Sequence, residues 1–291
     1  MLVRRTFLQA LAASAIAIPA AGRALLSSPT GLSRAIAAIE GGSGGRLGVA
    51  MLDTGTGARF GHRDGERFAF CSTFKFLLAG AMLRRRDEGG DPLDLPLDVR
   101  AADIVSHSPF SKTRVGGRAT IGELCHATMT TSDNGAANIL LRRLGGLDPL
   151  QRFVRGIGDQ DTRFDRWEPA LNTAIAGDSR DTTTPAVMLA NLNRLLLGDA
   201  LGEASRAQLL GWMLANTTGG NRLRAGIPPA WRVGDKTGTG ENGSNNDIAI
   251  ILPPGRAPIL VASYLTENDL PSEKADKIHA DVARAVVEAL G

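Results

Sequence analysis

The order in which two hydrophobic periodicities follow each other is the feature that most constrains how this chain can fold. Strand-like patterns are confined to the two chain ends, at 46–52, 58–62, 230–239, 246–253 and 258–266. From residue 72 to about 216 the pattern is helical. We therefore expect an α/β fold of the α+β type: both chain ends build one antiparallel sheet with flanking helices, and an all-helical subdomain is inserted between them.

The same pattern predicts subdomain boundaries. The sheet-containing subdomain is predicted at 28–70 and 213–291, and the helical subdomain at 71–212. Helix starts are predicted at a Thr120–Glu123 capping box, at Asp148-Pro149 and at Thr184-Pro185.

One segment, 158–184, has no sustained periodicity and is rich in charge. A loop of this length inside a compact domain is usually functional or disordered. Because it contains Trp167, Leu171 and Ile175, we expect a packed loop, and it is the first place to look for function.

Residues 1–27 read as an export signal rather than as part of the fold. Arg4 and Arg5 precede an apolar run at 10–21 that is too short to span a bilayer comfortably. This pattern predicts a periplasmic or secreted protein exported by the twin-arginine route. Without Arg4, Arg5 and Arg23, the 33 basic residues fall to 30, equal to the 30 acidic residues. Neither nucleic-acid binding nor membrane association after signal removal is therefore expected.

Ser72 and Lys75 lie one helical turn apart at the head of a strongly apolar run. They form the only Ser-x-x-Lys in the chain, and Lys75 is one of only five lysines among 33 basic residues. A buried lysine can lose its proton, whereas arginine effectively cannot. Burial would lower the Lys75 pKa and make this lysine a base for Ser72; the alternative is a snorkelling surface lysine.

Two further stretches place polar groups where a ligand could approach. Ser132, Asp133 and Asn134 fall between two predicted helices, where an ordinary capped turn is the alternative. Lys236 stands on a predicted strand that Gly238 interrupts, and glycine there lets a ligand or another backbone come close. A hairpin edge is the alternative for this stretch.

Other patterns favour no chemistry. The Gly-x-Ser-x-Gly at 41–45 lies between a helix and a strand, the reverse of a nucleophile elbow, and reads as a flexible turn. Cys71 and Cys125 are expected to be buried free thiols, although an exported protein could pair them. The four histidines show no zinc-site spacing, and no metal or organic cofactor is expected.

Three motifs in a fixed order resemble those of the penicillin-recognising serine enzymes: Ser-Thr-Phe-Lys from Ser72, Ser-Asp-Asn from Ser132 and Lys-Thr-Gly from Lys236. The stretch "RWEPALN" resembles the Glu-x-x-Leu-Asn loop of class A serine β-lactamases. Arg166 and Asp181 match the ion pair that closes this loop in the family. The exported chain is therefore identified, by resemblance, as a class A serine β-lactamase.

This resemblance implies a role for each matching residue. Ser72 would be the nucleophile, and its proton would pass to Lys75 or, through water, to Glu168. Ser132 would protonate the departing lactam nitrogen, and Glu168 with Asn172 would hold the water that hydrolyses the acyl-enzyme. The implied substrate-binding residues are Asn134 for the side-chain amide, Lys236, Thr237, Gly238 and Thr239 around the carboxylate, and Arg222, near Arg224, in support of them. The backbone N–H groups of Ser72 and Thr239 would form the oxyanion hole.

The expected activity is hydrolysis of the lactam amide of penicillins, and also of cephalosporins, by a monomer. Two disulfides found in some members cannot form, because Ala79 and Gly240 occupy the partner positions of Cys125 and Cys71. The missing disulfide between Cys71 and position 240 argues against carbapenem hydrolysis. A peptidoglycan D,D-peptidase, a β-lactam sensor domain and a serine glutaminase are the alternatives, and Glu168 argues against the first.

Overall fold

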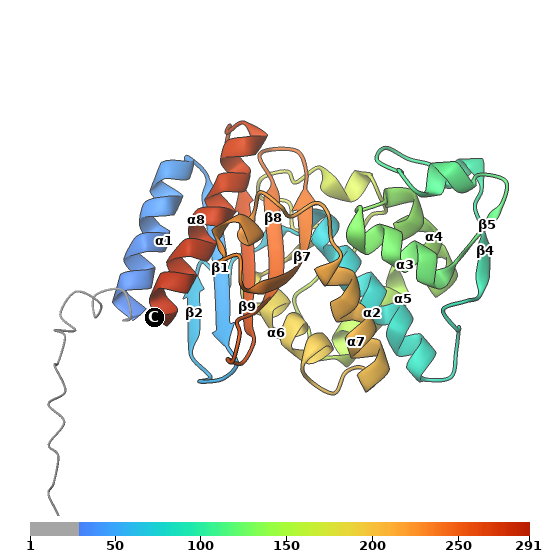
Figure 1. The fold of residues 1–291 in the computed structure, drawn as a ribbon. Coiled ribbons are helices and arrows are strands. Elements are labelled where there is room, and N and C mark those ends of the chain that lie inside the picture. Colours follow the sequence, from blue (N-terminus) through green and yellow to red (C-terminus); the bar gives the residue numbers. More distant parts are fainter. Residues whose placement is uncertain (1–28) are drawn as a thin grey trace, which may run out of the picture.

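The computed structural model describes residues 29–291, so the export signal predicted for residues 1–27 lies outside the described residues. The main sheet has five antiparallel strands in the order β2-β1-β9-β8-β7 (Figure 1). Its strands are β1 (Arg46–Asp53), β2 (Arg59–His62), β7 (Arg232–Thr239), β8 (Asn245–Leu252) and β9 (Ile259–Thr266). The prediction of one antiparallel sheet built from both chain ends is confirmed.

Helices cover both faces of this sheet. α1 (Pro29–Ser43) and α8 (Ser272–Leu290) pack against each other on one face, whereas α6 (Pro185–Leu196) packs against β1 and β9 on the other (Figure 1). Because α6 belongs by sequence to the helical part, the sheet and the helical part share a core. The exact subdomain boundaries stay a prediction.

The pairing of β1 with β9 joins the two ends of the chain. All eight residues of β1 are paired, from Arg46 opposite Thr266 to Asp53 opposite Ile259. Alternate side chains of the neighbouring β8 enter two different cores. Ile250 packs toward the helical part, and Ile251 packs toward α1 and α8, as the twofold repeat of a strand requires. Burial on both faces explains why this strand reads as a continuous apolar run.

The helical part is arranged around α2 (Phe74–Asp87), whose residues from Phe74 to Leu83 are all buried. The helices that pack against it are α3 (Ile121–Thr130), α4 (Asn134–Leu144), α5 (Leu147–Gly156) and α7 (Glu203–Leu214). The inserted part is not all-helical as predicted, because it contains β4 (Pro96–Asp98) paired with β5 (Arg118–Thr120), and β6 (Thr182–Thr183) paired with β3 (Phe68–Ala69). These strands are only two or three residues long, too short to produce a visible alternating pattern in the sequence. Within residues 29–291, no helix is both long enough and apolar enough to cross a membrane.

Most of the predicted helix ends are confirmed. The Thr120 hydroxyl and the Glu123 carboxylate form a reciprocal capping box, and Thr184 caps α6 with Pro185 in the first turn. The helix predicted to start at Asp148-Pro149 is present as α5, but its N-cap is Gly146, so Asp148 lies within the first turn. The turn predicted at 41–45 is shorter than expected, since α1 continues through Ser43.

Candidate active site

Ser72 lies just before α2, whose first ten residues are all buried. It belongs to a 3₁₀ turn, Cys71–Thr73, that leads directly into α2. Lys75 follows one turn later, so its Nζ lies 2.9 Å from Ser72 Oγ. The side chain of Lys75 is fully buried, which excludes the snorkelling alternative.

The environment of Lys75 combines burial with compensating contacts. Its Nζ lies 2.9 Å from Glu168 Oε1 and donates to the Ser132 carbonyl oxygen and to Asn134 Oδ1, at 2.8 and 2.5 Å. Burial lowers the pKa of Lys75 below its usual value, and the negative charge of Glu168 partly offsets this effect. The expectation of a buried lysine with a lowered pKa is confirmed.

Glu168 reaches the same point from the long loop. Its Oε1 lies 3.3 Å from Ser72 Oγ, and its Oε2 accepts a hydrogen bond of 2.5 Å from Asn172 Nδ2. The Oδ1 of Asn172 is buried and has no hydrogen-bond partner among residues 29–291. A free acceptor beside a carboxylate suits a bound water molecule.

Asn138 holds the main chain of Glu168, and sequence reasoning did not identify this residue. Asn138 Nδ2 donates to the Glu168 carbonyl oxygen at 2.9 Å, and the Glu168 N–H donates to Asn138 Oδ1 at 3.2 Å. Asn138 lies one turn after Asn134 on α4. That repeat of asparagines on one helix face was the only available sequence signal.

The ends of the long loop are joined by charged groups. Arg166 Nε lies 2.5 Å from Asp181 Oδ2, which confirms the ion pair expected there. Asp181 Oδ1 also accepts the backbone N–H groups of Asp165 and Arg166. The expectation of apolar packing is only partly right, because Leu171 is buried whereas Trp167 and Ile175 are among the exposed large apolar residues.

Ser132 connects the two buried lysines. It lies between α3 and α4 with a left-handed backbone (φ 59°). Its Oγ lies 3.1 Å from Lys236 Nζ and 3.3 Å from Lys75 Nζ. The neighbouring Asp133 instead has a local structural role, since it caps α4 and accepts the backbone N–H groups of Phe110 and Ser111. Asn134 faces the site and also donates to the Ser106 carbonyl oxygen.

Lys236 stands on β7, which runs alongside the turn that carries Ser72. It is fully buried, and burial together with the nearby positive charge of Lys75 holds its pKa well below the usual value. A Cβ atom at Gly238 would lie 2.8 Å from the Phe70 carbonyl oxygen. The prediction that glycine permits a close backbone approach is confirmed.

Arg222 links the end of β7 to β8 and α8. Its guanidinium donates to the carbonyl oxygens of Gly238 and Asn246, to Thr239 Oγ1 at 2.7 Å, and to Asp276 Oδ1 at 2.7 Å. Asp276 lies on α8 and was not identified from the sequence.

The other arginine, Arg224, pairs with Asp235 instead. The two arginines are therefore distinguished by tertiary contacts. Thr237 Oγ1 forms a hydrogen bond of 2.5 Å with Thr218 Oγ1, a second partner that the sequence did not indicate.

Both cysteines are buried free thiols, as expected. Burial raises the pKa of the Cys71 thiol to about 12, so it stays protonated beside Ser72. Among residues 29–291, no group of three or more His, Cys, Asp or Glu side chains could hold a metal ion.

Comparisons with known proteins show which family the chain belongs to. A family model described as the β-lactamase enzyme family matches residues 31–290. β-Lactamase AST-1 of Nocardia asteroides is 48% identical over 255 residues, which cover 88% of this chain and 82% of that protein. β-Lactamase L2 of Stenotrophomonas maltophilia is 44% identical over 100% of both chains.

Solved structures agree as well. An ancestral (GNCA) class A β-lactamase matches with a TM-score of 0.88 and 57% identity, covering 89% of this chain and 99% of that chain. A β-lactamase from Xanthomonas campestris also matches with a TM-score of 0.88, at 49% identity over 90% of this chain and 98% of its own. This chain therefore belongs to the class A β-lactamases and is a hydrolase of β-lactams.

Proposed function

We propose that this enzyme hydrolyses penicillins, and also cephalosporins, through an acyl-enzyme on Ser72 that Glu168 releases. The observation that carries the proposal is the position of Glu168 Oε1, 3.3 Å from Ser72 Oγ and 2.9 Å from Lys75 Nζ. One carboxylate can therefore act on the nucleophile and on a water that attacks its ester.

In acylation, Ser72 Oγ attacks the lactam carbonyl carbon and gives up its proton. Two acceptors are in reach, Lys75 directly and Glu168 directly or through a water. The carbonyl oxygen becomes an oxyanion, which the backbone N–H groups of Ser72 and Thr239 would stabilise. The C–N bond then breaks, and the ring nitrogen takes a proton from Ser132 Oγ, which lies between Lys75 and Lys236.

The substrate carboxylate would bind near Lys236, Thr237 and Thr239. Support for this assignment comes from Arg222. Its guanidinium donates to the Gly238 carbonyl oxygen and, at 2.7 Å, to Thr239 Oγ1 at the end of β7. The same guanidinium is held in place by Asn246 on β8 and Asp276 on α8. Arginine and lysine together provide the positive field that a carboxylate requires.

In deacylation, a water held by Glu168 and Asn172 would attack the ester carbon. Glu168 would accept the water's proton, and Ser72 Oγ would leave with a proton returned to it. A D,D-peptidase and a β-lactam sensor both stay acylated because they lack such a base, so the Glu168–Asn172 pair favours a hydrolase.

The test follows benzylpenicillin and a cephalosporin with the purified enzyme, by lactam absorbance and intact protein mass together. Many turnovers per enzyme molecule, with no lasting adduct, are expected for both substrates. A single adduct of substrate mass that persists would refute the proposed role of Glu168. Turnover without any adduct in a Glu168→Gln variant would refute the acyl-enzyme route.

We also propose that the protein is exported through the twin-arginine route as a monomer. Replacement of Arg4 and Arg5 by lysine should retain an unprocessed precursor in the cytoplasm. Normal export of that variant would contradict the proposal. Light scattering of the mature protein should give the mass of one chain, and a dimer mass would overturn the second part.

A further inference from the structure

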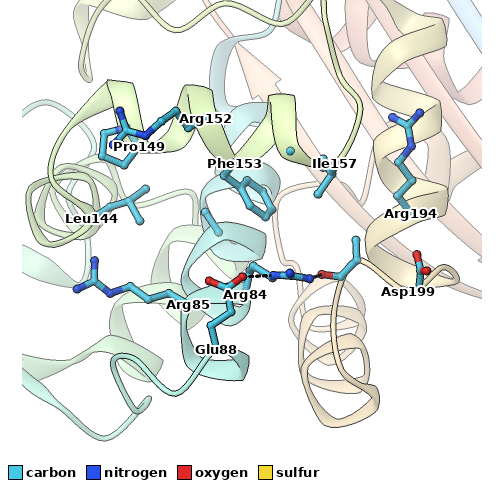
Figure 2. A pocket seen from close by; sticks show the side chains of 13 residues that line it. Arg84, Arg85, Glu88, Leu144, Pro149, Arg152, Phe153, Ile157, Arg194 and Asp199 are labelled. Carbon is cyan, nitrogen blue, oxygen red and sulfur yellow. Dashed lines mark hydrogen bonds and ion pairs between the residues drawn. The ribbon is translucent and has the colours of Figure 1, made fainter.

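A second concave site lies away from the catalytic residues. It is a groove of about 830 Å³ between α2, α5 and the segment around the end of α6 (Figure 2). Pockets for drug-sized ligands typically measure about 300–1,000 Å³. None of the residues proposed for catalysis or substrate binding lines this groove, so the hydrolytic reaction does not account for it.

The floor of the groove is apolar. It is formed by the side chains of Leu144, Pro149, Phe153 and Ile157, all of them half-buried. Figure 2 shows Phe153 extending from α5 toward α2, with its ring near the middle of the groove. An aliphatic or aromatic body of a ligand could displace water from this surface.

The rim carries more positive than negative charge. Four arginines line it (Arg84, Arg85, Arg152 and Arg194), against two lining acids, Glu88 and Asp199, and Asp91, which pairs with Arg85 from outside the lining. Over residues 29–291 the basic and acidic residues balance at 30 each, because the three arginines outside that range account for the excess over 30 in the total of 33. The groove therefore concentrates positive charge that the described chain as a whole does not have.

Two of these arginines are paired with acids and two are not. In the paired ones, Arg84 Nε lies 2.6 Å from Glu88 Oε1, and Arg85 Nε lies 2.9 Å from Asp91 Oδ2. Within residues 29–291, the side chains of Arg152 and Arg194 make neither a hydrogen bond nor an ion pair. Figure 2 places these two toward opposite ends of the groove.

Helix dipoles explain only part of this charge. Arg84 and Arg85 lie in the last turn of α2, and Arg194 lies in the last turn of α6, where cations are favourable. Arg152 lies in the middle of α5, where the helix dipole does not favour a cation. Its guanidinium beside an apolar floor instead suits a ligand with one charged end.

We propose that this groove binds an amphipathic organic anion, with an apolar body on Phe153 and a carboxylate or sulfonate head on Arg152 or Arg194. Exposed charge pairs are individually weak, so an inorganic anion alone would bind poorly. The apolar floor supplies the rest of the affinity, and the two unpaired guanidinium groups set the preference for a negative head.

The test uses 8-anilinonaphthalene-1-sulfonate as a fluorescent probe on the folded enzyme. The double variant Arg152→Gln/Arg194→Gln should bind the probe about tenfold more weakly. The matched control is Arg34→Gln/Arg59→Gln, which removes two exposed arginines whose side chains likewise form no pair in the described part of the chain. This control should bind the probe within twofold of wild type. Hydrolysis of benzylpenicillin at the wild-type rate would show that the groove variant is intact.

Competition and location complete the test. Decanoate or 1-naphthoate should displace the probe, and the better competitor tells whether the preferred body is aliphatic or aromatic. Amide NMR shifts on probe addition should fall in residues 81–88, 149–157 and 194–200. Unchanged affinity in the groove variant, equal displacement by inorganic phosphate, no displacement by either carboxylate, or shifts elsewhere would each overturn the proposal.

Discussion

Asn138→Ala offers a sharp test of how the structure positions the deacylating base. The change removes two hydrogen bonds to the Glu168 main chain, at 2.9 and 3.2 Å, and leaves Ser72 and Lys75 untouched. At about 1 kcal/mol each, the two bonds contribute about 2 kcal/mol to holding Glu168 in place. If the deacylation transition state loses this stabilisation, the rate of deacylation falls roughly 30-fold.

The assay separates the two half-reactions. Rapid-quench mass spectrometry with benzylpenicillin should show Asn138→Ala acylated at close to the wild-type rate, followed by slow release of the adduct. Asn193→Ala is the matched control, because Asn193 also lies on a helix, is half-buried and makes no side-chain hydrogen bond within residues 29–291. Thermal unfolding of both variants shows that they are folded. Deacylation within threefold of wild type in a folded Asn138→Ala would refute the reasoning.

Four further outcomes are expected. Glu168→Gln should lower deacylation by about 10²- to 10⁴-fold and accumulate acyl-enzyme, and rapid release from this variant would remove Glu168 as the base. Lys75→Arg should lower acylation at least about a hundredfold, because arginine keeps its proton; near wild-type turnover would contradict the proposed role of Lys75. Arg222→Gln should raise KM for benzylpenicillin about tenfold or more with a smaller effect on kcat, since it withdraws a guanidinium from the carboxylate site; an unchanged KM would count against that assignment. Burial lowers the pKa of His279 from 6.5 to about 3, so between these two pH values only the unfolded chain binds this proton. The free energy of unfolding should therefore fall with decreasing pH in this range, by up to about 1.4 kcal/mol per pH unit. Urea titrations at pH 7 and 4.5 should show a smaller loss of stability for His279→Gln than for wild type, and equal losses would refute this account.

Part of the candidate site could be predicted because its residues are close in sequence. Ser72 and Lys75 are three residues apart, and a helix brings that spacing onto one face in any fold. The glycine at position 238 also predicted a close backbone approach, because a Cβ atom there would lie only 2.8 Å from a carbonyl oxygen. Asn138 and Asp276 were missed, because their partners Glu168 and Arg222 are far from them along the chain.

The sequence by itself determined the elements and their order: strands at both ends, helices between them, and an apolar helix that begins with Ser72 and Lys75. These follow from hydrophobic period and local spacing, which need no knowledge of distant contacts. Only the tertiary structure decided that Arg222 rather than Arg224 reaches Thr239, and that Glu168 from the long loop meets Lys75. The physical reason is that an ion pair or hydrogen bond across the fold depends on where packing places each element. A one-dimensional pattern does not carry that information.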